Sequence, residues 1–276
     1  MLKSKNRIVQ YFENEWCIEY PEDLNNDYEQ FYTSLEFLNS DPLEGKRRLE
    51  ELIEKYPNEH IDAYIHLGNY YYDNLNFTLY RENIEKAFSL SNSLLPKEFN
   101  TKTAKITWSR ISNRAFLRAF HAKGLLYMQD MYFIKAIKIF KFLLSCNPND
   151  NQGIRYLLHD CYFRIEKYKS IISLFKNYPD DCSPESYFGL GLVYYKLNKK
   201  EKAKIHFLKG ISYFPNIARD LITNKTIYPI KEYTEEHFGI TSGGNIQSFE
   251  FRERNLLYWS GTNGAIEFLC DLIPSA

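Results

Sequence analysis

Two arginine–histidine pairs are the residues whose types and spacing suggest binding chemistry. Arg118 and His121 are three residues apart, and Arg155 and His159 are four apart, so each pair lies on one face of a helix. A guanidinium group can donate forked hydrogen bonds to a carboxylate or a phosphate. We therefore predict a ligand-binding or peptide-binding site made of Arg118, His121, Gln152, Arg155, His159 and Tyr162.

A structural role for the two arginines is the alternative. Arg118 and Arg155 would then pair with Asp150 or Asp160 and hold the turns between helices. Asp150, with Asn151 after it, also stands just before a predicted helix, where such residues usually cap the first turn.

Other chemistry finds little support in the residue patterns, and we predict no catalytic residue, no cofactor and no metal site. The sequence contains no H-E-x-x-H, G-x-x-x-x-G-K-[ST] or G-x-G-x-x-G motif. The run Glu235-Glu236-His237 is interpreted as a solvated turn. Cys161 stands at a core position of the pattern described next, so we expect an inert buried thiol.

The elements that position these residues follow a pattern written three times with a period of 33 to 34 residues. Its first copy is Phe120, Gly124, Tyr127, Ala136, Phe140 and Pro148. A weaker copy follows with Ile154, Leu158, Cys161, Ser170 and Leu174, and a nearly full one with Tyr187, Leu190, Gly191, Tyr194, Ala203, Phe207 and Pro215. A fixed period of this size indicates stacked units that bury their apolar faces against one another.

The order of aromatic, Leu-Gly, Tyr, Ala, Phe and Pro resembles the tetratricopeptide repeat, a helix–turn–helix unit. The resemblance implies an all-α fold, a right-handed α-solenoid of about five helix pairs with C-terminal capping helices. It also implies that the first helix of each pair lines a concave groove, and the predicted site residues occupy groove positions. We expect Gly124 and Ala136 to face each other across the third pair.

The chain divides by pattern into three parts. Residues 1–24 are an extension with a short helix and a loop, 25–217 are helical repeats, and 218–276 are a connector and a helical cap. Within the repeats we expect about four extra residues in the turn through residues 73–77 and one long helix over residues 103–128. The cap should contain two helices, over residues 246–260 and 264–272.

Several segments resemble more than a generic repeat. Trp108, residues 113–119 and His121 resemble an "NRPFLRA.H" signature of one bacterial group of repeat proteins, and residues 147–158 resemble its "NPNDNQG.RY.L" segment. The tail through Trp259 resembles "W....GALE.L", and a related tail occurs in the suppression-of-tumorigenicity proteins. The resemblance implies no particular biochemical activity.

Composition restricts the class of partner. The formal net charge is +0, which argues against nucleic-acid and membrane partners, and five scattered cysteines favour a reducing cytoplasm. We predict a cytoplasmic, non-enzymatic scaffold that binds a protein or peptide segment in its groove, the segment carrying an acidic group or a C-terminal carboxylate. The alternative is an enzyme accessory or a small anionic-ligand-binding protein that uses the arginine–histidine cluster.

Overall fold

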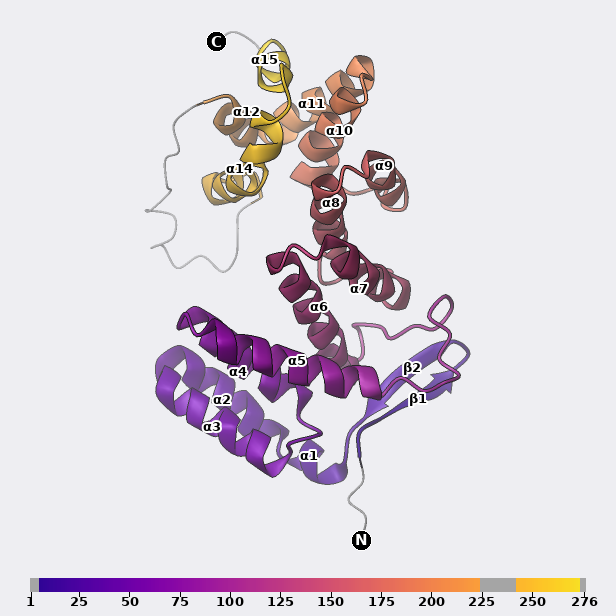
Figure 1. Cartoon of the computed structure of the whole chain (residues 1–276), viewed down its shortest axis with the longest axis vertical. Helices are drawn as coiled ribbons and strands as arrows, with labels where there is room; N and C mark the ends of the chain where they lie inside the picture. Colours follow the sequence, from indigo (N-terminus) through magenta and orange to yellow (C-terminus); the bar gives the residue numbers. More distant parts are fainter. Residues whose placement is uncertain (1–4, 224–241, 274–276) are drawn as a thin grey trace. The chain divides into compact units, whose positions relative to one another are not determined.

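The computed structural model describes residues 5–223 and 242–273, and the chain divides into two compact units, Met1–Ile165 and Glu166–Ala276. Each unit is described by itself (Figure 1). In both, consecutive helices pack against each other, and three-residue turns such as 130–132 and 197–199 join the two helices of a pair. The prediction of a mainly helical fold made of sequential helix pairs is confirmed.

The first unit opens with a β-hairpin, which corrects the short helix and loop expected in residues 1–24. Strands β1 (Arg7–Phe12) and β2 (Glu15–Glu19) are antiparallel, with Ile8 opposite Ile18. Three consecutive residues of β2, Trp16 to Ile18, are buried. Because both faces of β2 are covered, the strand lacks the alternation of apolar and polar residues that would reveal it.

The expected long helix over residues 103–128 is also wrong in its first eleven residues, 103–113. Residues 104–107 are not helical, and Lys105 forms an isolated bridge to the hairpin at Glu15, where the backbone N–H of Trp16 donates to the carbonyl of Lys105 at 2.8 Å. A 3₁₀ turn, η1 (Ile111–Asn113), follows, and α6 begins only at Arg114. The buried Asn113 amide holds this junction, because its Oδ1 accepts from the Ile18 N–H and its Nδ2 donates to the carbonyl of Trp16.

The helices of the first unit follow in sequence order, and from α2 to α8 each one contacts the next. Helices that are not consecutive also touch: α2 contacts α4, and α4 contacts α6, so the first helices of successive pairs lie side by side. Their bounds are α1 (Glu22–Asn26), α2 (Tyr28–Ser40), α3 (Pro42–Lys55), α4 (Ile61–Asp73), α5 (Phe77–Ser93), α6 (Arg114–Gln129), α7 (Phe133–Cys146) and α8 (Ile154–Arg164).

The turn between α4 and α5 is residues 74–76, three residues long, and not the extended turn that we expected. The α6–α7 turn, residues 130–132, has the same length. The expectation failed because Ile84 was aligned with Ala136, whereas it takes the place of Phe140. A Cβ added at Gly68 would contact Ile84, and one added at Gly124 would contact the Phe140 ring, each sixteen residues further on. Gly124 therefore makes room for Phe140 and does not simply face Ala136.

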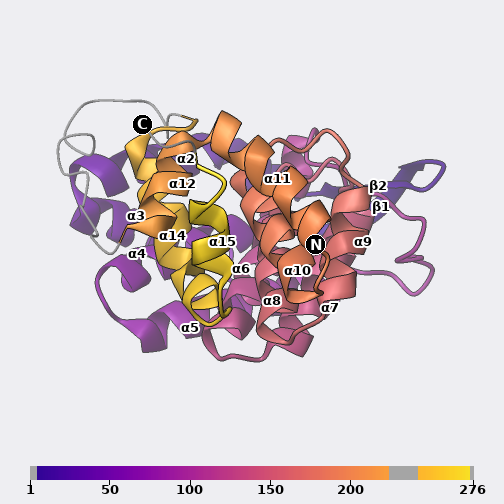
Figure 2. The same cartoon turned by 90° about the horizontal axis from the view of Figure 1, so that it is seen from above.

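The second unit contains α9 (Tyr168–Lys176), a π-helical turn η2 (Glu185–Gly189) that continues into α10 (Leu190–Lys196), and α11 (Lys200–Tyr213). α12 (Pro215–Ile222) contacts both α14 (Asn245–Ser260) and α15 (Ala265–Cys270), as Figure 2 shows. α14 and α15 confirm the two predicted closing helices. The buried indole of Trp259 lies 5.2 Å from the Phe207 ring, so α14 packs on α11. The predicted turn Glu235-Glu236-His237 lies outside the described residues.

Candidate functional site

The first helices of the first unit carry a row of polar side chains at equivalent places. Asp62 stands six residues before Gly68 in α4, and Arg118 stands six residues before Gly124 in α6. Arg118 donates from Nε to Asp62 Oδ1 at 2.9 Å, and its Nη2 binds the second carboxylate oxygen. Asp62 is buried, and 31% of the Arg118 side chain is exposed. One predicted site arginine is therefore held in a fork by the protein's own carboxylate.

Tyr28 in α2 extends this row. Burial, followed by the nearby Asp62 carboxylate, raises the pKa of the Tyr28 hydroxyl. The phenol therefore stays protonated and can donate a hydrogen bond to an acceptor. We call Tyr28, Asp62 and Arg118 the inner row. Asp62 had not been singled out from the sequence, although its place relative to Gly68 repeats that of Arg118 relative to Gly124.

Trp108 covers the arginine end of the row. The Arg118 guanidinium carbon lies 5.6 Å from the centre of the Trp108 ring, and that of Arg114 lies 5.1 Å from it. Arg114 Nε also donates to the Trp108 carbonyl at 3.1 Å. The segment that replaces the expected helix start thus supplies an aromatic surface for two arginines, which favours a fixed guanidinium plane.

His121 and Gln152 form a second contact between neighbouring elements. Gln152 Nε2 lies 3.3 Å from His121 Nδ1, a distance at which the amide can donate to a neutral imidazole. Burial lowers the pKa of His121 to about 4. The ring is therefore uncharged at pH 6, and burial rather than the nearby arginines is the cause.

Asp150 and Arg155 form the third contact, at the start of α8. Asp150 Oδ1 accepts from the Ile154 N–H at 2.6 Å and Oδ2 from the Arg155 N–H at 3.0 Å, so its carboxylate caps the helix. Arg155 Nη1 donates to the same Oδ2 at 2.9 Å, and Nη2 donates to the Tyr156 hydroxyl at 2.6 Å. This is the pairing with Asp150 that the structural alternative predicted for Arg155.

The last two predicted residues differ in access. His159 is 2% exposed and its ring lies 5.8 Å from Phe163, so it is a core residue. Tyr162 is half-buried, and burial raises the pKa of its hydroxyl. The six predicted residues thus lie on or beside α6 and α8, but a ligand at the surface can reach Arg118 and Tyr162 and cannot reach His159. Their role in binding remains a prediction.

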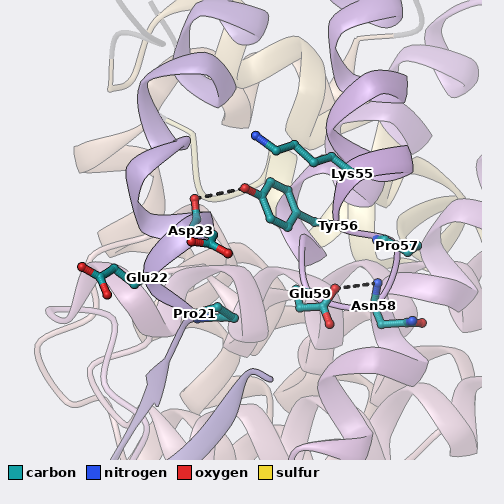
Figure 3. Close-up of a pocket in the computed structure, with 8 residues that line it drawn as sticks. All are labelled: Pro21, Glu22, Asp23, Lys55, Tyr56, Pro57, Asn58 and Glu59. Carbon is teal, nitrogen blue, oxygen red and sulfur yellow. Dashed lines mark hydrogen bonds between the residues drawn. The ribbon is translucent and has the colours of Figure 1, made fainter. Parts of the chain in front are cut away.

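A hollow of about 410 Å³ lies elsewhere in the first unit, between α1 and the α3–α4 connection (Figure 3). The Tyr56 hydroxyl points across it toward the Asp23 carbonyl, 3.1 Å away. Lys55, the cation beside it, is paired with Asp27. Its lining is Pro21, Glu22, Asp23, Lys55, Tyr56, Pro57, Asn58 and Glu59. With acidic side chains prevailing, the hollow is unsuited to an anion.

The cysteines and the other potential metal ligands of the described residues give no sign of a further reactive site. Burial raises the pKa of Cys146 and of Cys161 to about 12, so both thiols are unreactive at neutral pH. Residues 5–223 and 242–273 contain no group of three His, Cys, Asp or Glu side chains placed to hold a metal ion. In the same ranges no helix combines the length and the hydrophobicity needed to cross a bilayer.

Comparison with known proteins gives the family. The model of the family Tcf25, described as transcriptional repressor TCF25, matches residues 17–271. The chain belongs to the Tcf25 family. No curated protein matches it. The Tcf25 match includes the inner row, Trp108 and α7, whereas strand β1 lies before the matched residues.

One solved structure similar to this Tcf25-family chain is "Structure of Naa15/Naa10 bound to HypK-THB". The match has 16% sequence identity and a TM-score of 0.42, and it covers 90% of this chain and 34% of that chain. The Tcf25-family chain thus spans about a third of the chain that it matches. A bacterial origin, the tetratricopeptide name and a cytoplasmic location remain predictions.

Proposed function

We propose that this Tcf25-family chain is a non-enzymatic scaffold that binds a segment of another protein along the first helices of its first unit. The observation that carries the proposal is the side-by-side contact of α2, α4 and α6, which holds the partly exposed Arg118 side chain on the buried Asp62 carboxylate. Tyrosine, tryptophan and arginine are the residue types enriched where proteins bind one another.

Arg118 is the group that we expect to contact the partner. Asp62 and Trp108 fix its plane, while Nη1 makes no hydrogen bond among the described residues. A preoriented donor loses little side-chain entropy on binding. Because Asp62 already neutralises the charge, Nη1 suits a peptide carbonyl, or one oxygen of the partner's carboxylate, better than a free dianion.

The alternative, an enzyme accessory or a small anionic-ligand-binding protein, has less support. A ligand phosphate would have to displace Asp62 from Arg118 and Asp150 from Arg155, and His159 is buried. The hollow in Figure 3 is lined by none of these residues. The family description as a transcriptional repressor would place the partner among proteins that control transcription, and we include this in the proposal.

The test is a cross-linking pull-down from extracts of the cells that make the protein. Wild type is compared with Arg118→Ala and with Arg47→Ala, a matched control because Arg47 is exposed on α3 and also paired with carboxylates. We expect Arg118→Ala to lose specific partners and Arg47→Ala to keep them. Equal recovery with both variants, together with sulfate binding that requires Arg118, would favour the anionic-ligand alternative.

A further inference from the structure

A second surface of the first unit has the features of a docking site. It lies on the second helix of a pair, whereas the inner row lies on first helices. It consists of the α6–α7 turn and the solvent face of α7 (Figure 1). We call it the α7 face and define it by six exposed residues: Met131, Tyr132, Ile134, Lys135, Lys138 and Lys141. Spacings of three, four and seven residues along α7 place Ile134, Lys138 and Lys141 on one stripe.

The three apolar side chains of the α7 face are more than half exposed to solvent. Met131 is 75% exposed, Tyr132 54% and Ile134 58%. Met131 also has a φ of 59°, in the left-handed region that favours Gly or Asn. The α10–α11 turn has the same three-residue form, and there Asn198 takes this place with a φ of 57°. Leu75, in the same place of the α4–α5 turn, has the same φ of 59° and is also 75% exposed, so Met131 alone does not indicate a docking site. What distinguishes the α7 face is that Met131 lies in sequence beside two further exposed apolar residues and three exposed lysines.

The charged part of the α7 face is uncompensated. Residues 131–149 contain no Asp or Glu. Asp130, which precedes this run and lies near enough to Lys135 to interact with its charge, already accepts two hydrogen bonds from Arg81. In the described part of the chain, none of Lys135, Lys138 and Lys141 forms an ion pair; Lys135 instead lies over the Tyr132 ring, 4.5 Å from its centre.

We propose that the α7 face docks an amphipathic acidic segment of another protein, with its carboxylates on the three lysines and its apolar side chains on Met131, Tyr132 and Ile134. This binding goes beyond the proposed function, because it uses a different surface and different chemistry. Lys135 and Lys138 are three residues apart, as are Lys138 and Lys141, so the three ammonium groups extend over about 9 Å, roughly two turns of a partner helix. Nucleic acid fits less well, because the face has no arginine fork for phosphate, and its one aromatic ring, that of Tyr132, already has Lys135 over it.

The experiment measures the fluorescence anisotropy of a labelled amphipathic helical peptide, with Leu on one face and Glu on the other, as it is titrated with the full chain. The charge variant is Lys135→Glu with Lys138→Glu and Lys141→Glu. Repulsion replaces attraction at three places, so the Kd should rise about tenfold or more, and wild-type binding should weaken as salt is raised. A peptide with Lys in place of Glu should not bind.

The matched control is Lys202→Glu with Lys204→Glu and Lys209→Glu, three exposed lysines on α11, the second helix of a later pair. It should leave the Kd within about twofold of wild type. A loss equal to that of the α7 variant would show attraction by net charge alone and would overturn the proposal. Tighter binding of a single-stranded oligonucleotide at the same lysines, or a dimer that the α7 variant abolishes, would overturn it in favour of another occupant.

A second variant, Met131→Asn, separates docking from folding. Asn tolerates the left-handed backbone, so this variant should melt at the same temperature as wild type or higher. Removal of the thioether from the face should nevertheless raise the Kd for the acidic peptide about threefold to tenfold. Unchanged peptide binding by Met131→Asn and by Ile134→Ser would show that the apolar part of the α7 face is not used, which contradicts the proposal.

Discussion

Replacing Gly124 by Ala should destabilise the first unit, because the space that its missing side chain leaves is filled by Phe140. An added Cβ would lie 2.7 Å from Phe140 Cζ and 2.9 Å from Cδ1, whereas nonbonded carbons prefer about 3.5–4.0 Å. Phe140 is fully buried, so its ring cannot move into solvent. Overpacking of this kind costs about 1–3 kcal/mol, against a gain of about 1 kcal/mol from the better helix propensity of Ala. We expect a net loss of up to about 2 kcal/mol, and a larger one for Gly124→Leu.

The chain provides a matched comparison at Gly68. There the added Cβ would lie 3.1 Å from Ile84 Cδ1, the end of a side chain that can adjust by a few tenths of an ångström. The propensity gain should then prevail, and Gly68→Ala should be neutral or more stable by up to about 1 kcal/mol. Gly191→Ala is a repeat of the Gly124 case, because its Cβ would meet Phe207 Cδ1 at 2.6 Å.

Urea unfolding followed by circular dichroism measures these changes as shifts in midpoint at constant slope. The combination of Gly124→Ala with Phe140→Leu should recover part of the loss, since a smaller side chain at position 140 removes the overlap. Equal shifts for Gly124→Ala and Gly68→Ala, or no recovery in the double variant, would refute the close approach of Gly124 and Phe140.

Three further changes test the charges and the turns. Burial lowers the pKa of His60 to about 4, below its ordinary value of 6.5, so the folded state binds fewer protons and loses stability as the pH falls from 6.5 to 4. His60→Asn should keep the cap on the Ala63 N–H and reduce that acid loss by about 1–3 kcal/mol in unfolding measured at pH 7 and pH 4.5. Arg118→Ala should cost about 2–4 kcal/mol, because it leaves the buried Asp62 carboxylate unpaired, and Asp62→Asn in the same chain should recover much of it in a double-mutant cycle. Met131→Asn should raise the free energy of unfolding by about 0.5–1 kcal/mol through relief at its positive φ, and a loss would show that Met131 is packed rather than strained.

The helix pairs could be predicted from the sequence because their packing depends on a few residues at fixed spacing. Gly124 with Phe140 and Gly191 with Phe207 recur sixteen residues apart, and the structure brings each pair into contact. The error at Gly68 arose because Ile84 carries the same role with a different residue type. The packing needs a large apolar side chain opposite the glycine, and an Ile can fill that space as well as a Phe.

The hairpin and the true start of α6 could not be predicted, because long-range partners determine them. Trp16 and Lys105 are far apart in sequence but are joined by a backbone hydrogen bond. Asn113 begins the segment that resembles a signature, but that resemblance says nothing of its bonds to the hairpin. The same limit applies to the candidate site. The pattern placed Arg118 at a groove position, with Asp150 or Asp160 as its alternative partner. Its actual partner, Asp62, lies 56 residues earlier in the sequence, and nothing in the spacing distinguishes it from the other acids there.

Partner binding at the inner row and partner binding at the α7 face should differ in their dependence on salt, because the charges that balance the two sites lie in different places. On the inner row, Arg118 is matched by a buried carboxylate, so a partner adds hydrogen bonds without adding net charge attraction. On the α7 face, Lys135, Lys138 and Lys141 are exposed, and a partner would supply the missing carboxylates across solvent. The screening length falls from about 10 Å at 0.1 M salt to about 3 Å at 1 M, which is shorter than the span of the three lysines. Binding lost with Arg118→Ala should therefore persist between 0.1 M and 0.5 M salt, whereas binding lost with the α7 charge variant should weaken severalfold over that range. A partner that needs Arg118 but dissociates in 0.5 M salt would mean that the Asp62 pair opens on binding, and the inner row would then have to be treated as an anion site after all.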